Sequence, residues 1–145
     1  SFWFRNALPA LRDGFPADSI STDLHMGNIN GPVVNTITTM SKYLSMGMPL
    51  QEVIYRSTVT PAREIRRPEL GTLSVGAEAD VAVIRHLKGS FGYSDCGRAK
   101  MIGDAKLECA MTIRAGKVVY DPPGLSMPLW EQAPAPYWGI PNLQG

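Results

Sequence analysis

The sequence contains few of the residues on which metal centres, disulfide scaffolds and membrane spans depend. Its 145 residues include only two histidines and no H-x-H motif, which falls short of the three or four ligands that a zinc site requires. The two cysteines, Cys96 and Cys109, form no CxxC motif and allow at most one disulfide, so we expect reduced thiols. No apolar run approaches the length needed to cross a bilayer.

An excess of charge of either sign is also missing. Fourteen basic and thirteen acidic residues give a net charge of +1, which leaves no electrostatic footprint for nucleic acid or an anionic membrane. The hydrophobic fraction of 44% and the charged fraction of 19% are typical of a globular chain. The N-terminal stretch lacks the layout of a signal peptide. We therefore expect a cytoplasmic protein that binds neither nucleic acid nor membrane.

The chain opens on an aromatic cluster. Phe2, Trp3 and Phe4 follow Ser1 directly. Three aromatic side chains exposed at a natural N-terminus would be a liability for aggregation. We expect that further polypeptide upstream, or a partner surface, normally covers them.

The first half of the chain carries helical periodicity around one short strand. The predicted elements are a helix over 4–13, a strand over 18–22, and helices over 33–46, 49–58 and 60–65. Gly14 and Gly47 are placed to end the first two helices. Thr60 followed by Pro61 predicts the N-cap of the last one.

The composition changes after Pro68 and predicts β-structure. The stretch "GTLSVGAEADVAVIR" predicts strand, turn and strand, and "KLECAMTIRAGKVVYD" predicts a hairpin that turns at "RAG". The region beyond residue 121 holds six of the twelve prolines and has no periodicity, which favours an extended tail. Since a lone strand cannot bury itself, we interpret the first half as the last βα unit of a larger fold.

A carboxylate and an imidazole follow the predicted strand. In "SISTDLHMGNINGP", residues 19–32, Asp23 ends the strand and His25 comes two residues later, before a loop rich in Asn and Gly. Such a stretch is either a loop that happens to be polar or the rim of an active site. Taken alone, Asp23 is better explained as a strand-end carboxylate that caps backbone amides.

Longer stretches carry a family resemblance. "DSISTDLH", "NGP", "TTMSKYLSMGMPLQEVIYRSTVTPAREI" and "LGTLSVGAEADVAVI" together resemble the C-terminal part of an amidohydrolase-superfamily metallohydrolase, in the amidohydrolase/deacetylase subgroup related to dihydroorotases. The resemblance implies an α/β fold. Residues 1–66 would be the final βα units of a metal-dependent (β/α)8 TIM barrel, residues 67–121 a segment of a small β-sandwich, and residues 122–145 a Pro-rich tail.

The resemblance also implies an activity. The parent enzyme would use metal-activated water to hydrolyse an amide or ester bond in a small N-acyl or cyclic amide substrate. One or two divalent ions, with zinc expected, would bind in the complete enzyme, where Asp23 would contact the metal and act as general acid and base. The remaining ligands would come from a missing N-terminal barrel portion or from another chain, so we expect the segment alone to be inactive.

Two further expectations concern assembly. We expect the enzyme to be a homo-oligomer. The alternative to catalysis is a non-catalytic scaffold or interaction module derived from an amidohydrolase.

The polar neighbours of Asp23 each have two interpretations. His25 either orients Asp23, in contact with the substrate or behind it, or binds the loop backbone, and both are favoured over direct metal ligation. Asn28, Asn30 and Gly31 either offer amide groups to a substrate or are the residues that a tight loop requires.

Residues outside this loop have simpler expectations. Arg5 either grips a substrate carboxylate or faces solvent. Thr38, Thr39 and Lys42 are expected on a solvated helix face, and Asp80 is expected to be a turn carboxylate before a strand.

Overall fold

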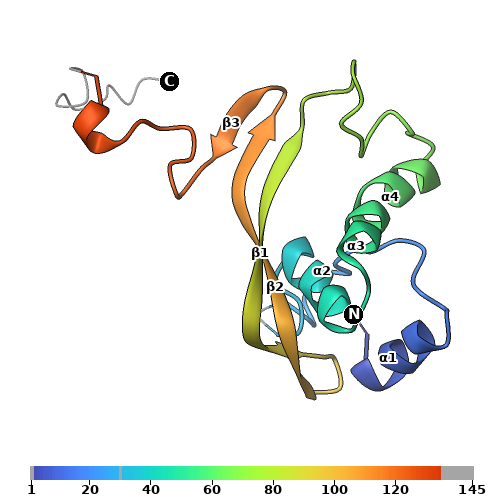
Figure 1. Cartoon of the computed structure of the whole chain (residues 1–145). Coiled ribbons are helices and arrows are strands. Elements are labelled where there is room, and N and C mark those ends of the chain that lie inside the picture. Colours follow the sequence, from blue (N-terminus) through green and yellow to red (C-terminus); the bar gives the residue numbers. More distant parts are fainter. Residues whose placement is uncertain (1, 30, 135–145) are drawn as a thin grey trace.

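The computed structural model describes residues 2–29 and 31–134 as a group of helices beside a long, twisted antiparallel hairpin (Figure 1). The helices are α1 (Phe4–Arg12), α2 (Thr36–Ser45), α3 (Leu50–Ser57), α4 (Val59–Glu64) and the short 3-10 helix η1 (Trp130–Gln132). The strands are β1 (Val81–Ser94), β2 (Lys100–Arg114) and β3 (Lys117–Tyr120), and they pair in the order β1-β2-β3. The expected α/β class is confirmed, whereas the barrel and the β-sandwich stay predictions.

The predicted helix over 4–13 is confirmed as α1. It ends at Arg12, and Gly14 follows with a φ of 82°, a left-handed conformation that favours glycine. Its first turn is held from far along the chain, because Asp95 Oδ2 accepts a hydrogen bond of 3.0 Å from the Phe4 amide. The helix N-terminus is therefore fixed by the loop between β1 and β2.

The strand predicted over 18–22 is wrong. This segment is extended but forms no ladder, and its one described backbone bond to a neighbouring element runs from the Ile20 amide to the Arg56 carbonyl at 2.7 Å. A strand needs a hydrogen-bonded neighbour, and none runs beside this segment in the part of the chain that the structure describes. Ile20 is nevertheless buried.

The helix predicted over 33–46 begins three residues late, as α2. Asn35 is its N-cap: the backbone there is extended, and Asn35 Oδ1 accepts a 2.8 Å hydrogen bond from the Thr38 amide. Val33 instead forms an isolated bridge with Ile29. Gly47 follows the helix with a φ of 102°, as the sequence predicts.

Helices α3 and α4 follow almost without a break, and this makes one prediction wrong. The helix predicted over 49–58 is confirmed as α3, with Val53 fully buried. Thr60 is not an N-cap, because it already lies inside α4. The residue before α4, Thr58, uses its hydroxyl to donate to the Ile54 carbonyl at 2.8 Å rather than to cap the new helix.

The first of the two strands predicted in 71–85 is also wrong. Residues 71–80 form turns and bends, and strand structure begins only at Val81. Gly71 has a φ of 67° and lies so close to the Thr58 carbonyl that a side chain there would overlap it. The turn at Gly71 therefore packs against the start of α4, and the segment forms no strand.

The β2–β3 hairpin is confirmed, and Asp80 has a different role from the one expected. Ala115 and Gly116 form the turn, with φ values of 47° and 75°. Asp80 Oδ1 accepts a 2.8 Å hydrogen bond from the Ala115 amide, so it holds this turn 35 residues away rather than its own. Strand β1 runs on to Ser94, beyond the predicted end, because it pairs with β2 down to Lys100.

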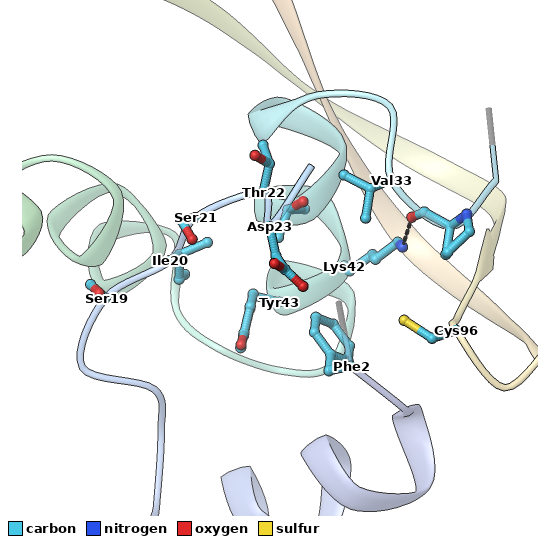
Figure 2. A pocket seen from close by; sticks show the side chains of 12 residues that line it. Phe2, Ser19, Ile20, Ser21, Thr22, Asp23, Val33, Lys42, Tyr43 and Cys96 are labelled. Carbon is cyan, nitrogen blue, oxygen red and sulfur yellow. Dashed lines mark hydrogen bonds between the residues drawn. The ribbon is translucent and has the colours of Figure 1, made fainter. Parts of the chain in front are cut away.

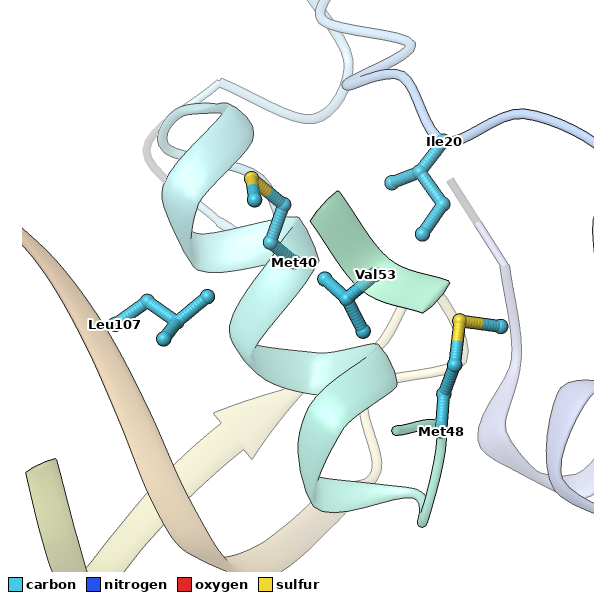
Figure 3. Packing of buried hydrophobic residues seen from close by; sticks show 5 residues of the cluster. All are labelled: Ile20, Met40, Met48, Val53 and Leu107. Carbon is cyan, nitrogen blue, oxygen red and sulfur yellow. The ribbon is translucent and has the colours of Figure 1, made fainter. Parts of the chain in front are cut away.

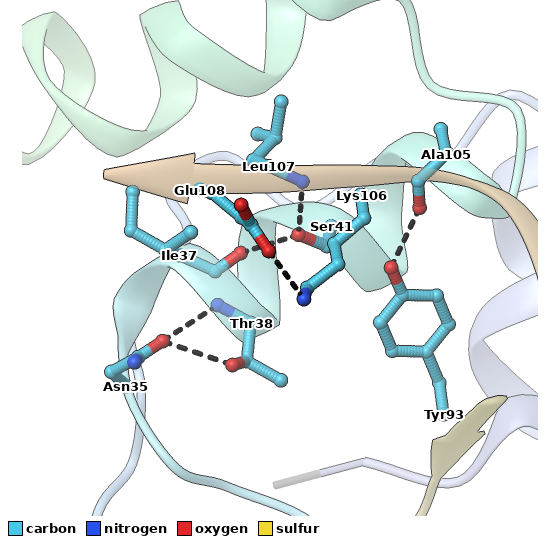
Figure 4. A network of polar contacts seen from close by, with 9 residues as sticks. All are labelled: Asn35, Ile37, Thr38, Ser41, Tyr93, Ala105, Lys106, Leu107 and Glu108. Carbon is cyan, nitrogen blue, oxygen red and sulfur yellow. Dashed lines mark hydrogen bonds and ion pairs between the residues drawn. The ribbon is translucent and has the colours of Figure 1, made fainter. Parts of the chain in front are cut away.

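The core lies where α2 crosses β2. One buried cluster joins Leu107 of β2 to the helices, as Figure 3 shows; its members are Ile20, Met40, Met48, Val53 and Leu107. Polar groups are satisfied at the same place (Figure 4). Ser41 Oγ accepts from the Leu107 amide at 2.9 Å and donates to the Ile37 carbonyl at 2.7 Å. Helix α2 is thus locked to the sheet by both apolar and polar contacts.

The far end of the sheet and the tail have little cover. All four residues of β3 are exposed, and so is Trp130 in η1. Of the predicted tail, residues 135–145 lie outside the described residues. None of the described helices has the length and apolar character that crossing a membrane would need.

Candidate functional site

A hollow of about 180 Å³, here called the rim hollow, opens beside the segment that leads to Asp23 (Figure 2). Helix α2 contributes Lys42 and Tyr43 to its wall, and Phe2 comes from the start of the chain. Cys96, from the loop between β1 and β2, closes one side. Three segments far apart in the sequence therefore meet around one carboxylate.

Asp23 has an unusual backbone. Its φ of 49° lies in the left-handed region, which residues other than glycine seldom adopt. Its carbonyl accepts a 2.5 Å hydrogen bond from Asn28 Nδ2. Figure 2 shows the carboxylate pointing into the rim hollow on the side of Phe2 and Tyr43. The structure therefore places the carboxylate where a bound molecule in the hollow would meet it.

His25 lies on the loop, away from the lining of the hollow. Its Nδ1 accepts a 3.0 Å hydrogen bond from the Gly27 amide, and its own amide donates to Asn28 Oδ1 at 2.8 Å. The ring is exposed. The geometry is that of a histidine bound to the loop backbone, one of the two arrangements that the sequence allows.

Asn28 and Gly31 build the loop. Asn28 is buried, with Oδ1 bound to the His25 amide and Nδ2 bound to the Asp23 carbonyl. The Gly31 amide donates to the Asn28 carbonyl at 3.2 Å. Asn30 lies outside the described residues. Asn28 thus has both side-chain polar atoms in use within the loop.

The structure does not bring Arg5 together with Asp23. The Arg5 guanidinium stacks on the Trp3 ring, 4.0 Å from the ring centroid. It lines a second, wider hollow of about 550 Å³ between α1 and the loop from β1 to β2, with Lys100 on the other side. Any ligand that Arg5 contacts there would lie outside the rim hollow.

The solvated face expected for Thr39 and Lys42 is wrong, because both are buried. Lys42 Nζ donates to the Pro32 carbonyl and, at 2.7 Å, to the Ser94 carbonyl. Burial lowers the pKa of Lys42, against a smaller opposite effect of Cys96 and Asp95. One signal in the sequence pointed this way: Lys42 lies one helical turn before the buried Met46.

The described residues do not by themselves fit a metal ion. Asp23 is one carboxylate, and the part of the chain that the structure describes holds no group of three or more His, Cys, Asp or Glu side chains arranged as ligands. A zinc site needs three or four protein ligands. A metal centre would therefore need donors from beyond these residues.

Comparisons with known proteins give one consistent result. The Amidohydrolase family matches residues 4–119. A deacetylase from Enterococcus faecalis is 34% identical over 122 residues, which are 83% of this chain and 33% of that protein. A deacetylase from Brucella anthropi is 45% identical over 83 residues, which are 57% of this chain and 21% of that protein.

Solved structures agree in fold. The chain superposes on an adenine deaminase with a TM-score of 0.78 at 33% identity, and on a dihydroorotase with a TM-score of 0.76 at 32% identity. Each superposition covers 83% of this chain and 33% of the other. The chain thus spans about a third of the length of the Enterococcus faecalis deacetylase and of the adenine deaminase. With a family match over most of its residues, the chain belongs to the Amidohydrolase family.

Proposed function

We propose that the chain is the C-terminal part of a deacetylase-type hydrolase that cleaves an amide or ester bond in a small N-acyl or cyclic amide substrate. Family membership and relatives named deacetylase, adenine deaminase and dihydroorotase support a hydrolase that acts on C–N bonds. The division into a barrel part over 1–66, a sandwich segment over 67–121 and a tail from 122 belongs to the same proposal. So do a cytoplasmic location and a homo-oligomeric state.

The observation that carries the proposal is the placement of Asp23. Its carboxylate faces the rim hollow from a left-handed backbone, and strained positions of this kind cluster at functional sites. In the proposed reaction the carboxylate takes a proton from the attacking water as the new C–O bond forms. It then returns that proton to the leaving amine or alkoxide as the old bond breaks.

The activity belongs to a larger assembly than these residues. The family is generally metal-dependent, and we expect a divalent ion, zinc by preference, with Asp23 among its ligands. Because the described residues supply no three-ligand group, the other ligands must come from another segment or another chain. The same observation favours the second candidate, a scaffold that has lost the chemistry.

The test is Asp23→Asn in the whole protein, assayed against a panel of N-acyl amino acids and cyclic amides with zinc supplied. Loss of the acid–base group is expected to lower kcat by roughly 10² to 10⁴-fold while the fold survives. The matched control is Asp18→Asn, an exposed carboxylate on the same segment outside the rim hollow. Activity within a few-fold of wild type in Asp23→Asn would refute the role. A folded, metal-loaded wild type that hydrolyses nothing would favour the scaffold.

A further inference from the structure

Lys42 is a buried cation held by neutral groups. The residue is only 4% exposed, and its Nζ donates to the carbonyls of Pro32 and Ser94. The ammonium also lies 5.9 Å from the centroid of the Phe2 ring. Among the described residues no carboxylate oxygen lies within ion-pair distance of it. Burying a charge without an ion-pair partner is costly, so we expect the two carbonyl contacts to have a structural role that offsets this cost.

The two carbonyls belong to separate parts of the molecule. Pro32 lies near the end of the loop that follows Asp23, which we call the rim loop (residues 24–33). Ser94 ends β1, 52 residues beyond Lys42 in the chain. One ammonium group on α2 thus joins the rim loop to the long hairpin.

In the described part of the rim loop, residues 24–29 and 31–33, there are few other anchors. Met26 is 93% exposed, and Leu24 and Ile29 are exposed as well. The hydrogen bonds of its described residues are mostly internal and centre on Asn28, whose side-chain amide donates to the Asp23 carbonyl at 2.5 Å. The loop is therefore a unit attached to Asp23 at one end and, through Pro32 and the buried Val33, to α2 at the other.

Asp23 needs such support. A left-handed backbone at a residue other than glycine persists only where the surroundings hold it. We propose that Lys42 is a positioning residue: by tying the rim loop to the tip of the hairpin, it keeps the Asp23 carboxylate aimed into the rim hollow. This inference rests on the role of Asp23 proposed above.

The neighbouring residue on α2 offers a matched control. Ser41 is 1% exposed and, like Lys42, bonds a backbone group of the hairpin, but that group is the Leu107 amide in the core. Ser41→Ala removes a buried hydrogen bond from the same helix without touching the rim loop. A lysine that only helped α2 to pack would resemble Ser41 in every measurement.

Hydrogen exchange in the whole protein tests the tether directly. In Lys42→Met the rim-loop amides of Asn28, Ile29, Gly31 and Val33 are expected to exchange about tenfold faster or more, with α3 unchanged. Ser41→Ala is expected to leave these amides as in wild type. Lys42→Gln, which keeps two N–H donors, is expected to fall between and serves if the methionine variant does not fold. Unchanged exchange in the folded variants would overturn the proposal.

Kinetics then separate positioning from simple packing. Because a displacement of about 1 Å can cost up to a hundredfold in rate, Lys42→Met is expected to lower kcat by roughly 10 to 100-fold. KM is expected to stay within about threefold. Ser41→Ala is expected to change neither. Faster loop exchange with wild-type kcat would refute positioning. If Asp23→Asn keeps its turnover while Lys42→Met loosens the loop, the acid–base role fails and the tether stands.

Discussion

The two ends of the β1-β2-β3 sheet have very different surroundings. On the side towards the hairpin tip, Tyr93 near the end of β1 and Leu107 in the middle of β2 are buried against the helices, and Leu107 is only 2% exposed. At the other end, Val83 of β1 is exposed, and so are Val118 and Val119 of β3, the strand paired with β2; Val119 is 60% exposed. We call these the covered half and the open half. The comparison indicates that full burial in this sheet comes from the helices that pack on it, since a β-branched side chain without a helix over it stays exposed at Val83, Val118 and Val119.

The largest effect is expected in the covered half. Leu107→Ala empties the centre of the cluster between β2 and α2, which is expected to cost about 2–5 kcal/mol of unfolding free energy. Val119→Ala, its counterpart in the open half, is expected to change stability by less than about 0.5 kcal/mol. Urea denaturation followed by circular dichroism measures both. Equal losses would abolish the distinction between the two halves.

A glycine sharpens the contrast through the distance between helix and sheet. A Cβ on Gly103 of β2 would overlap the Ser45 side chain of α2 and would lie 2.9 Å from Tyr93 Cε2. Gly103→Ala is therefore expected to cost about 1–3 kcal/mol through overpacking. Gly92→Ala is the control in the neighbouring strand, because its Cβ would meet only Lys100 Cδ at 3.6 Å. Thermal unfolding of the two variants compares them, and similar melting temperatures would contradict the close approach.

The tip of the hairpin is also expected to respond to pH. Burial of Asp95 favours its neutral form, but hydrogen bonds from the Ala99, Phe4 and Gly97 amides outweigh this and lower its pKa. Because the folded-state pKa is the lower one, the stabilisation is complete above the usual aspartate range and disappears as the pH falls through the lowered value.

Asp95→Asn is accordingly expected to cost about 1–2 kcal/mol at pH 7 and progressively less below about pH 4. Urea midpoints measured from pH 3 to pH 7 check the slope. Asp104→Asn, an exposed carboxylate on β2, is the control and is expected to follow wild type at every pH. A stability difference that does not depend on pH would show that the charge of Asp95 is irrelevant.

The smallest effect is expected in the open half. Val118→Thr keeps a β-branched side chain at an exposed position of β3, and it is expected to alter the unfolding free energy by no more than about 0.5 kcal/mol. A loss above 1 kcal/mol in the whole protein would show that this end of the sheet is covered by something beyond the described residues.

Local signals predicted the elements that depend on local interactions. The apolar spacing of α1 and α3, the glycines that follow α1 and α2, and the alternation and turn of the β2–β3 hairpin are contained in neighbouring residues. The apolar spacing begins at Val33 and so predicts a helix that starts there. The helix starts later because the Asn35 side chain caps it by accepting from the Thr38 amide. The segments around Ile20 and Leu73 were predicted as strands on side-chain character alone, and strands form only where a partner exists.

The candidate site was predictable in part. The family resemblance pointed to Asp23, and the structure places its carboxylate at the rim hollow, while its chemistry stays a prediction. Lys42 was missed because charge normally indicates a solvated position and its partners, Pro32 and Ser94, are distant in sequence. The second half of β1 was missed for the same reason: "HLKGSFGYS" has no clean alternation and becomes strand through its pairing with β2.

The cap on α1 has a consequence for how the chain is made. The Phe4 amide donates its hydrogen bond to Asp95, which lies 91 residues further along the chain and is therefore synthesised later. At a ribosomal rate of roughly 5 to 20 residues per second, Asp95 is added about 5 to 18 seconds after Phe4. During that interval α1 lacks both the Asp95 acceptor and its contact with Tyr93, so α1 is expected to reach its final packing only after the tip of the hairpin has been made.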